Sequence, residues 1–272
     1  MHALIFAAGL GTRLKPLTDT LPKALIPIAG KPLLQWQIEK LKAASIEDII
    51  INVHHFPDLI IDFLNQNNNF GCRITISDER DRLLDTGGAL KKILTTNPSP
   101  LTAHRSPLLA CNVDILSNID LNAFIDSYTT SPGPSGLLVV SQRSTQRYLC
   151  FDDQLNLVGW TNIATGEIKP SLLNASSPSL EKRVGERFTL FAFSGMQILS
   201  PETLTLLAQM PQDKFSLIDF YMSVCEEQIK NQKSQFPNLK AYIPSDFRMM
   251  DIGKIDHLAE SEAFARSLIS AE

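Results

Sequence analysis

The sequence predicts an α/β fold, a three-layer sandwich in which a mostly parallel central sheet is covered by helices on both faces. Short apolar runs rich in β-branched residues alternate with amphipathic stretches from residue 3 to residue 141. Hydrophobic residues are nearly continuous within these runs, which is typical of strands buried on both faces of a parallel sheet. No linker-like tract divides the 272 residues, so we expect one domain, 1–272, built from two lobes.

The first lobe, residues 1–141, is expected to repeat a strand followed by a helix. The expected strands are residues 3–7, 49–53, 73–77, 107–111 and 136–141, and the expected helices are residues 33–44, 57–67, 86–95 and 120–130. The carboxyl ends of parallel strands meet at one edge, and ligands of open α/β sheets bind outside that edge. The loop after the first strand and Asp114 after the fourth both fall there.

The second lobe, residues 142–272, has a looser pattern. Its expected elements are a hairpin of residues 147–152 and 158–161, a Ser-rich loop at 174–178, a strand at 188–193, and helices at 215–229 and from Ile255. The chain has no internal repeat, and in particular none of the hexapeptide repeats that form a β-helix. This lobe is expected to supply a second wall for a ligand bound at the edge of the sheet.

Composition excludes several classes of protein. Apolar residues make up 44% of the chain and charged residues 20%, which is ordinary for a globular domain. A net charge of −4 provides no basic face for nucleic acid or an anionic membrane. The apolar run at the amino terminus follows no basic segment and is too short to cross a bilayer. We therefore expect a soluble, cytoplasmic monomer or homo-oligomer without nucleic-acid or membrane partners.

Cysteine and histidine do not point to a metal or redox centre. The four cysteines, Cys72, Cys111, Cys150 and Cys225, show no C-x-x-C spacing, and we expect them to be reduced and buried. His54 and His55 are adjacent at the end of an expected strand. Side chains of neighbouring strand residues point to opposite faces, so the pair is not expected to hold one ion.

Residues 4–14, LIFAAGLGTRL, give the strongest functional signal. An apolar strand breaks into a bend where Gly9 and Gly11 let backbone N–H groups approach oxyanions without a Cβ in the way. Arg13 and, after a short gap, Lys23 supply positive charge. The pattern predicts a binding site for a polyphosphate.

Two other phosphate-binding motifs do not fit this segment. A dinucleotide fingerprint needs a third glycine where Leu14 stands, and an acidic residue after the second strand, where the chain has His54. A Walker loop needs Gly-Lys-Ser/Thr, which the sequence lacks. A dehydrogenase is therefore disfavoured.

Residues 7–31, AAGLGTRLKPLTDTLPKALIPIAGK, resemble the amino-terminal signature of the sugar-1-phosphate nucleotidyltransferases. That family includes glucose-1-phosphate thymidylyltransferases, mannose-1-phosphate guanylyltransferases and N-acetylmuramate-1-phosphate uridylyltransferases. Weaker matches follow in the family's order at residues 84–89, 112–114, 193–195 and 250–253. The resemblance implies a Rossmann-like fold of the nucleotide-diphospho-sugar transferase type, with a nucleotide-binding first lobe and a sugar-binding second lobe.

The resemblance also implies a reaction, the Mg²⁺-dependent transfer of a nucleotidyl group from an NTP to a hexose 1-phosphate with release of pyrophosphate. Joining two polyanions calls for a divalent cation and fixed positive charge rather than a protein nucleophile. The expected catalytic residues are Arg13, Lys23 and Asp114, and the expected metal ligands are Asp114 and Asp251. Expected nucleotide contacts are Ala7, Ala8, Gly9, Gly11, Thr12, Arg13, Lys23, Glu79 and Gly88; expected sugar-phosphate contacts are Gly87, Asn112, Lys182 and Gly195.

The acceptor side departs from the family pattern. Val113 stands where glycine is common, and the family's Glu-Lys-Pro motif, whose lysine grips the sugar phosphate, has no clean copy. Lys182 has about the right spacing before Ser194 and Gly195, whereas Lys169, within Glu-Ile-Lys-Pro, is an imperfect rival. The Leu-Asp-Thr-Gly-Gly-Ala-Leu version of the second glycine motif favours GTP or UTP as the donor.

Two other functions stay open. One is a cytidylyltransferase for a phosphorylated amino-alcohol, which would lack ligands for sugar hydroxyls in the second half. The other is a catalytically silent sensor of nucleotide sugars. A decayed site would be expected to lose at least one charged group, yet the chain has Arg13, Lys23, Asp114 and Asp251 together. The sequence therefore favours an enzyme.

Overall fold

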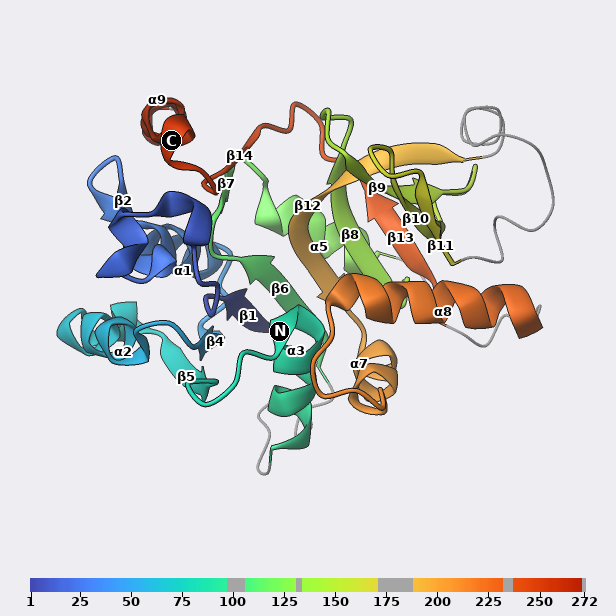
Figure 1. The fold of residues 1–272 in the computed structure, drawn as a ribbon, viewed down its shortest axis with the longest axis horizontal. Coiled ribbons are helices and arrows are strands. Elements are labelled where there is room, and N and C mark those ends of the chain that lie inside the picture. The colour runs from blue at the N-terminus through green and yellow to red at the C-terminus, as the bar shows by residue number, and fades with distance from the viewer. Residues whose placement is uncertain (97–105, 131–133, 171–187, 232–236, 271–272) are drawn as a thin grey trace.

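The first four long strands form a parallel core. The computed structural model describes residues 1–96, 106–130, 134–170, 188–231 and 237–270. Within its ten-stranded sheet, four neighbouring strands in the order β6-β1-β4-β5 are all parallel (Figure 1). They are β1 (His2–Phe6), β4 (Asp48–Val53), β5 (Arg73–Asp78) and β6 (Leu108–Asn112). Their carboxyl ends meet at one edge, as the sequence predicted.

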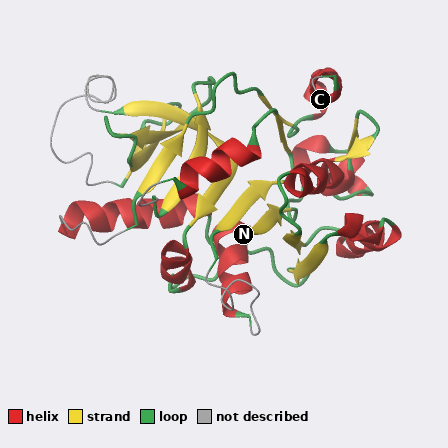
Figure 2. Cartoon of the chain, turned by 180° about the vertical axis from the view of Figure 1, so that it is seen from behind, coloured by secondary structure: helices red, strands yellow, loops and turns green. Residues whose placement is uncertain are grey.

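Helices cover both faces of this sheet. Side chains of β1 point alternately to the two faces, so Ala3 and Ile5 join one apolar core while Leu4 and Phe6 join the other. The first core is completed by α1 (Leu33–Ala43), α2 (Pro57–Gln66), α5 (Leu121–Thr129) and α9 (Leu258–Ile269). The second is completed by α3 (Asp85–Thr95), α7 (Pro201–Ala208) and α8 (Leu217–Asn231). Figures 1 and 2 show the arrangement from opposite sides and confirm the predicted three layers.

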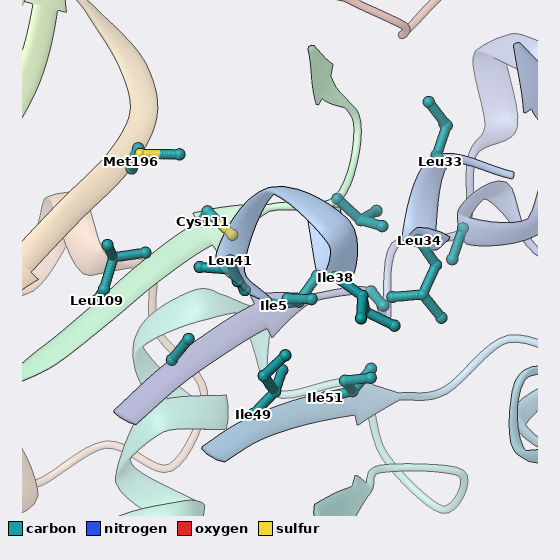
Figure 3. Packing of buried hydrophobic residues seen from close by; sticks show 14 of the residues in the cluster. Ile5, Leu33, Leu34, Ile38, Leu41, Ile49, Ile51, Leu109, Cys111 and Met196 are labelled. Carbon is teal, nitrogen blue, oxygen red and sulfur yellow. The ribbon is translucent and has the colours of Figure 1, made fainter. Parts of the chain in front are cut away.

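Helix α1 shows how the sequence pattern produces the packing. Leu34, Ile38 and Leu41 are spaced four and three residues apart, which places them on one side of the helix, and all three are buried. They pack in the same apolar cluster as Ile5 of β1 and Ile49 of β4 (Figure 3). The continuous apolar runs and the helical spacing therefore meet in one core.

Capping groups fix where two of the helices begin. The Asp120 carboxylate accepts hydrogen bonds from the backbone N–H groups of Asn122 and Ala123, at 2.9 and 3.1 Å, and α5 starts at the next residue. The Ser200 hydroxyl accepts from the N–H of Thr203 at 3.2 Å at the start of α7. The sequence analysis expected α5 but did not include α7.

Strand β12 (Thr189–Leu199) joins the two lobes. It pairs antiparallel with β6 on one side and with β8 (Gly136–Ser141) and β9 (Arg147–Phe151) on the other. Because β12 is antiparallel to both β6 and β8, the latter two run in the same direction. The carboxyl end of β8 therefore lies at the same edge as the glycine-rich loop.

The sheet is completed by elements of the second half. These are β10 (Leu157–Asn162), which forms the predicted hairpin with β9, then β11 (Glu167–Lys169) beside β10, and β13 (Leu239–Tyr242), which is parallel to β8. The expected strand at 188–193 continues to Leu199. Gly195, with a φ of +70°, interrupts the apolar pattern there, and the strand resumes after a shift in register.

Two short strand pairs and several short helices lie outside the main sheet. Strands β2 (Pro27–Ile28) and β3 (Lys31–Pro32) form one pair, and β7 (Ile115–Ser117) and β14 (Met249–Asp251) form the other. The 3₁₀ helices are Thr12–Leu14, Leu17–Asp19, Lys23–Leu25, Asn68–Gly71 and Ile255–His257. After β14 the chain returns to the first half, where α9 packs against β2 (Figure 1).

Three further expectations from the sequence concern the cysteines, membrane-spanning segments and the second-lobe loop. All four cysteines are free and buried, as predicted. Within the described ranges, no helix combines the length and the apolar character needed to cross a membrane. The Ser-rich loop at 174–178 and Lys182 lie outside the described residues.

Candidate active site

A cavity of about 510 Å³ opens at the carboxyl ends of the parallel strands. Nine of the residues predicted for the site line it: Ala7, Ala8, Gly9, Gly11, Thr12, Arg13, Lys23, Asn112 and Asp114. They come from the loop after β1, from the 3₁₀ helix at Lys23–Leu25 and from the end of β6. The cavity therefore forms where the topology places the ligands of an open α/β sheet.

The two glycines of the first loop have different physical roles. Gly11 has a φ of +63°, and a Cβ there would lie 2.7 Å from Cγ2 of Thr18 and 3.2 Å from Cβ of Lys23. Its carbonyl also accepts hydrogen bonds from the Thr18 hydroxyl at 2.9 Å and from the N–H of Leu14 at 2.8 Å. A Cβ on Gly9, by contrast, would meet nothing within 4 Å. Gly11 shapes the loop, whereas Gly9 leaves room for a ligand.

Lys23 and Asp114 form an ion pair at the centre of the site. Lys23 is only 8% exposed, which is rare for lysine and indicates that its side chain is held by the fold. Its partner follows β6, so the contact ties the loop after β1 to the end of the neighbouring strand. A buried ammonium paired with one carboxylate is positioned to meet the phosphate of an entering ligand.

Asp251 is brought to Asp114 by a pairing between distant segments. β14 lies antiparallel to β7 with Asp251 opposite Ile115, and the N–H of Ile252 donates to the carbonyl of Asp114 at 2.9 Å. The two predicted metal ligands are therefore neighbours, although much of the chain separates them in sequence. Composition and spacing contain no signal for this pairing, which only the family resemblance had suggested.

The surroundings of Asp251 raise the pKa of its carboxyl group above the ordinary value. Partial desolvation by the neighbouring protein is the largest cause, although the side chain keeps contact with solvent, and the carboxylate of Asp114 adds to it. Lys23, Arg13 and Arg143 act in the opposite direction. The site thus holds two carboxylates that repel each other, and the three nearby cations offset only part of this repulsion.

Gly253 is a residue that the site depends on and that the predicted contacts omitted. A Cβ at this position would lie 2.8 Å from Nη2 of Arg13 and 2.8 Å from Oδ1 of Asp251. Gly253 also lines the cavity. Its missing side chain lets the Arg13 guanidinium and the Asp251 carboxylate share one wall. Gly253 belongs to the family motif recognised at residues 250–253, but of these residues only Asp251 was assigned a role from the sequence.

Asn52 and Glu79 form a buried network under the first loop. The side-chain amide of Asn52 accepts from the N–H of Ala7 and donates to Oε1 of Glu79, both at 2.8 Å. Oε2 of Glu79 accepts from the N–H of Leu84 at 3.1 Å. Glu79 is 2% exposed, and burial raises the pKa of its carboxyl group. Asn52 lines the cavity and was not predicted; Glu79 does not line it.

Gly87 and Gly88 lie where two backbones approach closely. Both N–H groups donate to the carbonyl of Phe215, at 2.9 and 3.0 Å. A Cβ on Gly87 would lie 2.4 Å from the Phe215 ring, and one on Gly88 would lie 2.2 Å from the carbonyl oxygen of Asp213. These glycines seat the segment before α8 on the start of α3. Leu83, which precedes α3, and Asp85 and Thr86, in the first turn of α3, do line the cavity.

Gly195 and Asn112, both predicted on the acceptor side, are in contact. A Cβ on Gly195 would lie 2.9 Å from Nδ2 of Asn112 and 3.1 Å from Cγ1 of Ile115. Gly195 is in the left-handed region, with a φ of +70°, so another side chain would also be strained there. The irregularity in β12 therefore makes room for the end of β6 at the edge of the cavity.

Lys169 lies apart from the main cavity, on a second one of about 670 Å³ between β11 and α8. Its ammonium is 3.4 Å from Glu167 and 4.0 Å from Asp219, and it lies over the Trp160 ring.

The two histidines have separate backbone partners: Nδ1 of His54 is 2.7 Å from the Glu79 carbonyl, and Nε2 of His55 is 3.0 Å from that of Thr18.

The donor set suits a metal ion that arrives with phosphate groups. Among the described residues, no group of three or more His, Cys, Asp or Glu side chains could enclose an ion. Asp114 lines the cavity, and Asp251 offers a second carboxylate beside it. Mg²⁺ is commonly bound in proteins by one or two carboxylates, with phosphate oxygens and water as the remaining ligands.

Comparisons with known sequences agree with this chemistry. The sequence model of a family described as nucleotidyl transferase matches residues 2–267. The N-acetylmuramate alpha-1-phosphate uridylyltransferase of Caulobacter vibrioides is 33% identical over 222 residues, which cover 80% of this chain and 82% of that protein. The mannose-1-phosphate guanyltransferase of Kluyveromyces lactis is 29% identical over 212 residues, covering 78% of this chain and 53% of that protein.

Solved structures share the fold at low sequence identity. HddC from Yersinia pseudotuberculosis, complexed with GMP-PN, aligns with a TM-score of 0.68 at 22% identity and covers 97% of this chain and 100% of its own. A putative glucose-1-phosphate thymidylyltransferase from Bacillus anthracis, in complex with a sucrose, aligns with a TM-score of 0.73 at 16% identity, with coverages of 98% and 95%. At these identities the likeness concerns the fold.

The different roles of the two loop glycines can be tested with one pair of variants. Gly11→Ala should lower the free energy of unfolding by about 1–3 kcal/mol, because a left-handed conformation and a close contact both oppose the added methyl. Gly9→Ala should leave stability within about 0.5 kcal/mol but weaken nucleotide binding, since its methyl enters the cavity. Urea unfolding and titration with nucleoside triphosphates measure both. Equal stability losses for the two variants would contradict the distinction.

The buried network predicts a graded response at Glu79. Glu79→Ala leaves the Asn52 amide and the Leu84 N–H without acceptors, so we expect a loss of about 2–4 kcal/mol in the free energy of unfolding. Glu79→Gln retains one acceptor oxygen and should lose clearly less. Glu47→Ala, at an exposed site, is the matched control and should change stability by no more than about 0.5 kcal/mol. If Glu79→Ala lost no more stability than this control, the network would not contribute to the free energy of unfolding.

Asp251 should limit stability at neutral pH. Its pKa is higher in the folded protein than the ordinary value of 3.8, so ionisation of the carboxyl group costs stability at every pH above that range. Asp251→Asn removes this cost, and its melting temperature at pH 7 should exceed that of the wild type. The difference should shrink as the pH falls and disappear well below 3.8, where the carboxyl group is protonated in both the folded and the unfolded state. Calorimetric melting at several pH values measures this, and a large drop at pH 7 would refute it.

Proposed function

Because the chain belongs to the nucleotidyl transferase family, we propose that it transfers a nucleotidyl group from a nucleoside triphosphate to a sugar 1-phosphate. A phosphate oxygen of the sugar 1-phosphate attacks the α-phosphorus of the triphosphate in line. A new P–O bond forms, the bond to the leaving phosphate breaks, and pyrophosphate is released. The products are an NDP-sugar and pyrophosphate, and no covalent enzyme intermediate is required.

One observation carries this proposal: an open glycine loop, two cations and the carboxylate of Asp114 line one cavity, and a second carboxylate, that of Asp251, lies beside Asp114. The glycine loop contributes backbone N–H groups, while Arg13 and Lys23 contribute positive charge. The carboxylates of Asp114 and Asp251 are neighbours through the pairing of β7 and β14. Phosphoryl transfer depends on positioning and charge stabilisation, and these are the groups that supply both.

Each charged residue has a role in the proposed reaction. Arg13 holds the phosphates that leave, through the planar fork of its guanidinium group. Lys23 exchanges the carboxylate of Asp114 for the α-phosphate when the triphosphate enters, which frees Asp114. Asp114 and Asp251 would then hold Mg²⁺. When bound, the ion would neutralise charge that develops on the phosphate oxygens.

We propose UTP or GTP as the donor. The second glycine motif, Leu-Asp-Thr-Gly-Gly-Ala-Leu, supports this choice, and the relatives above are named as a uridylyltransferase and a guanyltransferase. The same names make N-acetylmuramate 1-phosphate and mannose 1-phosphate the first acceptors to test. Asn112 and Gly195 form the described part of the acceptor side. Lys182 stays a prediction for its phosphate, since Lys169 faces a different cavity.

The proposed activity is tested by a matrix of the common nucleoside triphosphates against several sugar 1-phosphates, read out by pyrophosphate release with and without Mg²⁺. We expect release with UTP or GTP and at least one hexose 1-phosphate, and loss of release when the metal is removed by EDTA. Asp114→Asn should retain less than about a tenth of wild-type release, which corresponds to more than about 1.4 kcal/mol of transition-state stabilisation. Full activity in EDTA would exclude the metal assignment, and no release from any pair would exclude the reaction.

A further inference from the structure

Arg143 is a charged residue at the active edge of the sheet that the predicted site did not include. It follows β8 by two residues, and the carboxyl end of β8 lies at the same edge as the glycine-rich loop. Its Nη2 atom donates to the carbonyl of Phe193 at 3.0 Å. Phe193 is two residues before Gly195, which contacts Asn112. The guanidinium group is therefore tethered beside the acceptor side.

The positive charge of Arg143 is not paired with a carboxylate in the described part of the chain. The side chain is exposed, and within the described ranges its guanidinium has no ion pair with a carboxylate. Its single described hydrogen bond leaves most of the five N–H donors of the guanidinium free. Its charge nevertheless acts on Asp251 across the site. The group is held by one hydrogen bond, to the Phe193 carbonyl, and is close enough to Asp251 for its charge to act on that carboxylate.

The proposed reaction needs a cation in this region. The acceptor phosphate carries close to two negative charges and must approach a triphosphate and two carboxylates. Lys23 is paired with Asp114, and Arg13 lies close to Gly253, beside Asp251. Both are assigned to the triphosphate. Lys169 belongs to the second cavity and has acidic neighbours of its own. Lys214, in the segment before α8, lines both cavities, whereas Arg143 is hydrogen-bonded to β12 two residues before Gly195.

We propose that Arg143 binds the phosphate of the sugar 1-phosphate and holds it for attack on the α-phosphorus. The inference rests on the proposed function and adds the residue that selects a phosphorylated acceptor. A guanidinium group donates two parallel hydrogen bonds to phosphate, so it orients the acceptor as well as attracting it. The Phe193 carbonyl fixes one side of the group and leaves the other side for the ligand.

The test uses the NTP and the sugar 1-phosphate that give the highest wild-type kcat/KM in the pyrophosphate-release matrix. Arg143→Ala should raise the KM for that sugar 1-phosphate at least tenfold while the KM for the NTP stays within about twofold. Arg143→Lys keeps the charge and should recover part of the loss. Arg73→Ala removes the same charge at the opposite edge of the sheet, where Arg73 pairs with Asp48, and is the matched control. Calorimetric titration of each protein with the same sugar 1-phosphate gives the dissociation constant directly.

Several outcomes would overturn the assignment of Arg143. An unchanged KM for the acceptor in Arg143→Ala would exclude it, provided that the wild type is active. An equal rise in both KM values with a lower melting temperature would instead make the residue a structural support for β12. If the wild type releases no pyrophosphate with any pair, the proposed function fails, and the assignment of Arg143 fails with it. If the wild type is active and Arg143→Ala has an unaltered KM for the acceptor, only the assignment of Arg143 is refuted, and the proposed function stands.

Discussion

The pairing of β7 with β14 is the contact on which the candidate site depends. It places Asp251 opposite Ile115 and fixes the backbone of Ile252 to that of Asp114. Two carboxylates side by side repel each other, and the raised pKa of Asp251 reflects that cost together with desolvation. Backbone hydrogen bonds hold them together despite this repulsion, and the surrounding cations offset part of it. The arrangement lowers the stability of the folded protein, but it creates a site of negative charge that favours binding of a cation.

The ion pair between Lys23 and Asp114 stabilises the same region before any substrate binds. Because Lys23 is almost fully buried, its ammonium could not be left without an anionic partner except at a large penalty, whereas Asp114 is partly exposed. In the proposed reaction, an entering triphosphate would offer Lys23 a second anion and release Asp114 for another partner. Donor binding and readiness of the carboxylate are thus coupled through one ammonium group. In the proposed reaction this coupling favours the triphosphate as the first substrate to engage the charged centre.

Much of the fold could be predicted because strands and helices of the first half carry local signals. Continuous apolar runs gave the parallel strands, and the order of motifs gave the family, to which the sequence model and the relatives also assign the chain. The acceptor side was harder. No local pattern reveals that β12 inserts between β6 and β8, or that Gly195 meets Asn112, because both depend on pairing between distant segments.

Glu79, Gly87 and Gly88 show a different limit of sequence reasoning. Gly87 and Gly88 belong to the recognised motif at residues 84–89, and Glu79 was expected to contact the nucleotide, but neither prediction says which protein group each residue meets. In the structure Glu79 binds Asn52 and the N–H of Leu84, and the two glycines receive the backbone before α8. Within the described contacts these residues support the cavity from behind. Arg143 is the converse case, since it belongs to no recognised motif and only the tertiary structure places it near Asp251.

The insertion of β12 also has a consequence for how the protein is made. While the chain grows, β6 has β1 on one side, but its other edge stays open until residues 189–199 have been synthesised. β14 and α9 follow later still, so the contact between Asp114 and Asp251 and part of the first core can form only after residues 249–269 have been synthesised. An unpaired edge can join strands of other chains. The emerging polypeptide therefore passes through a period in which association with its own copies competes with folding.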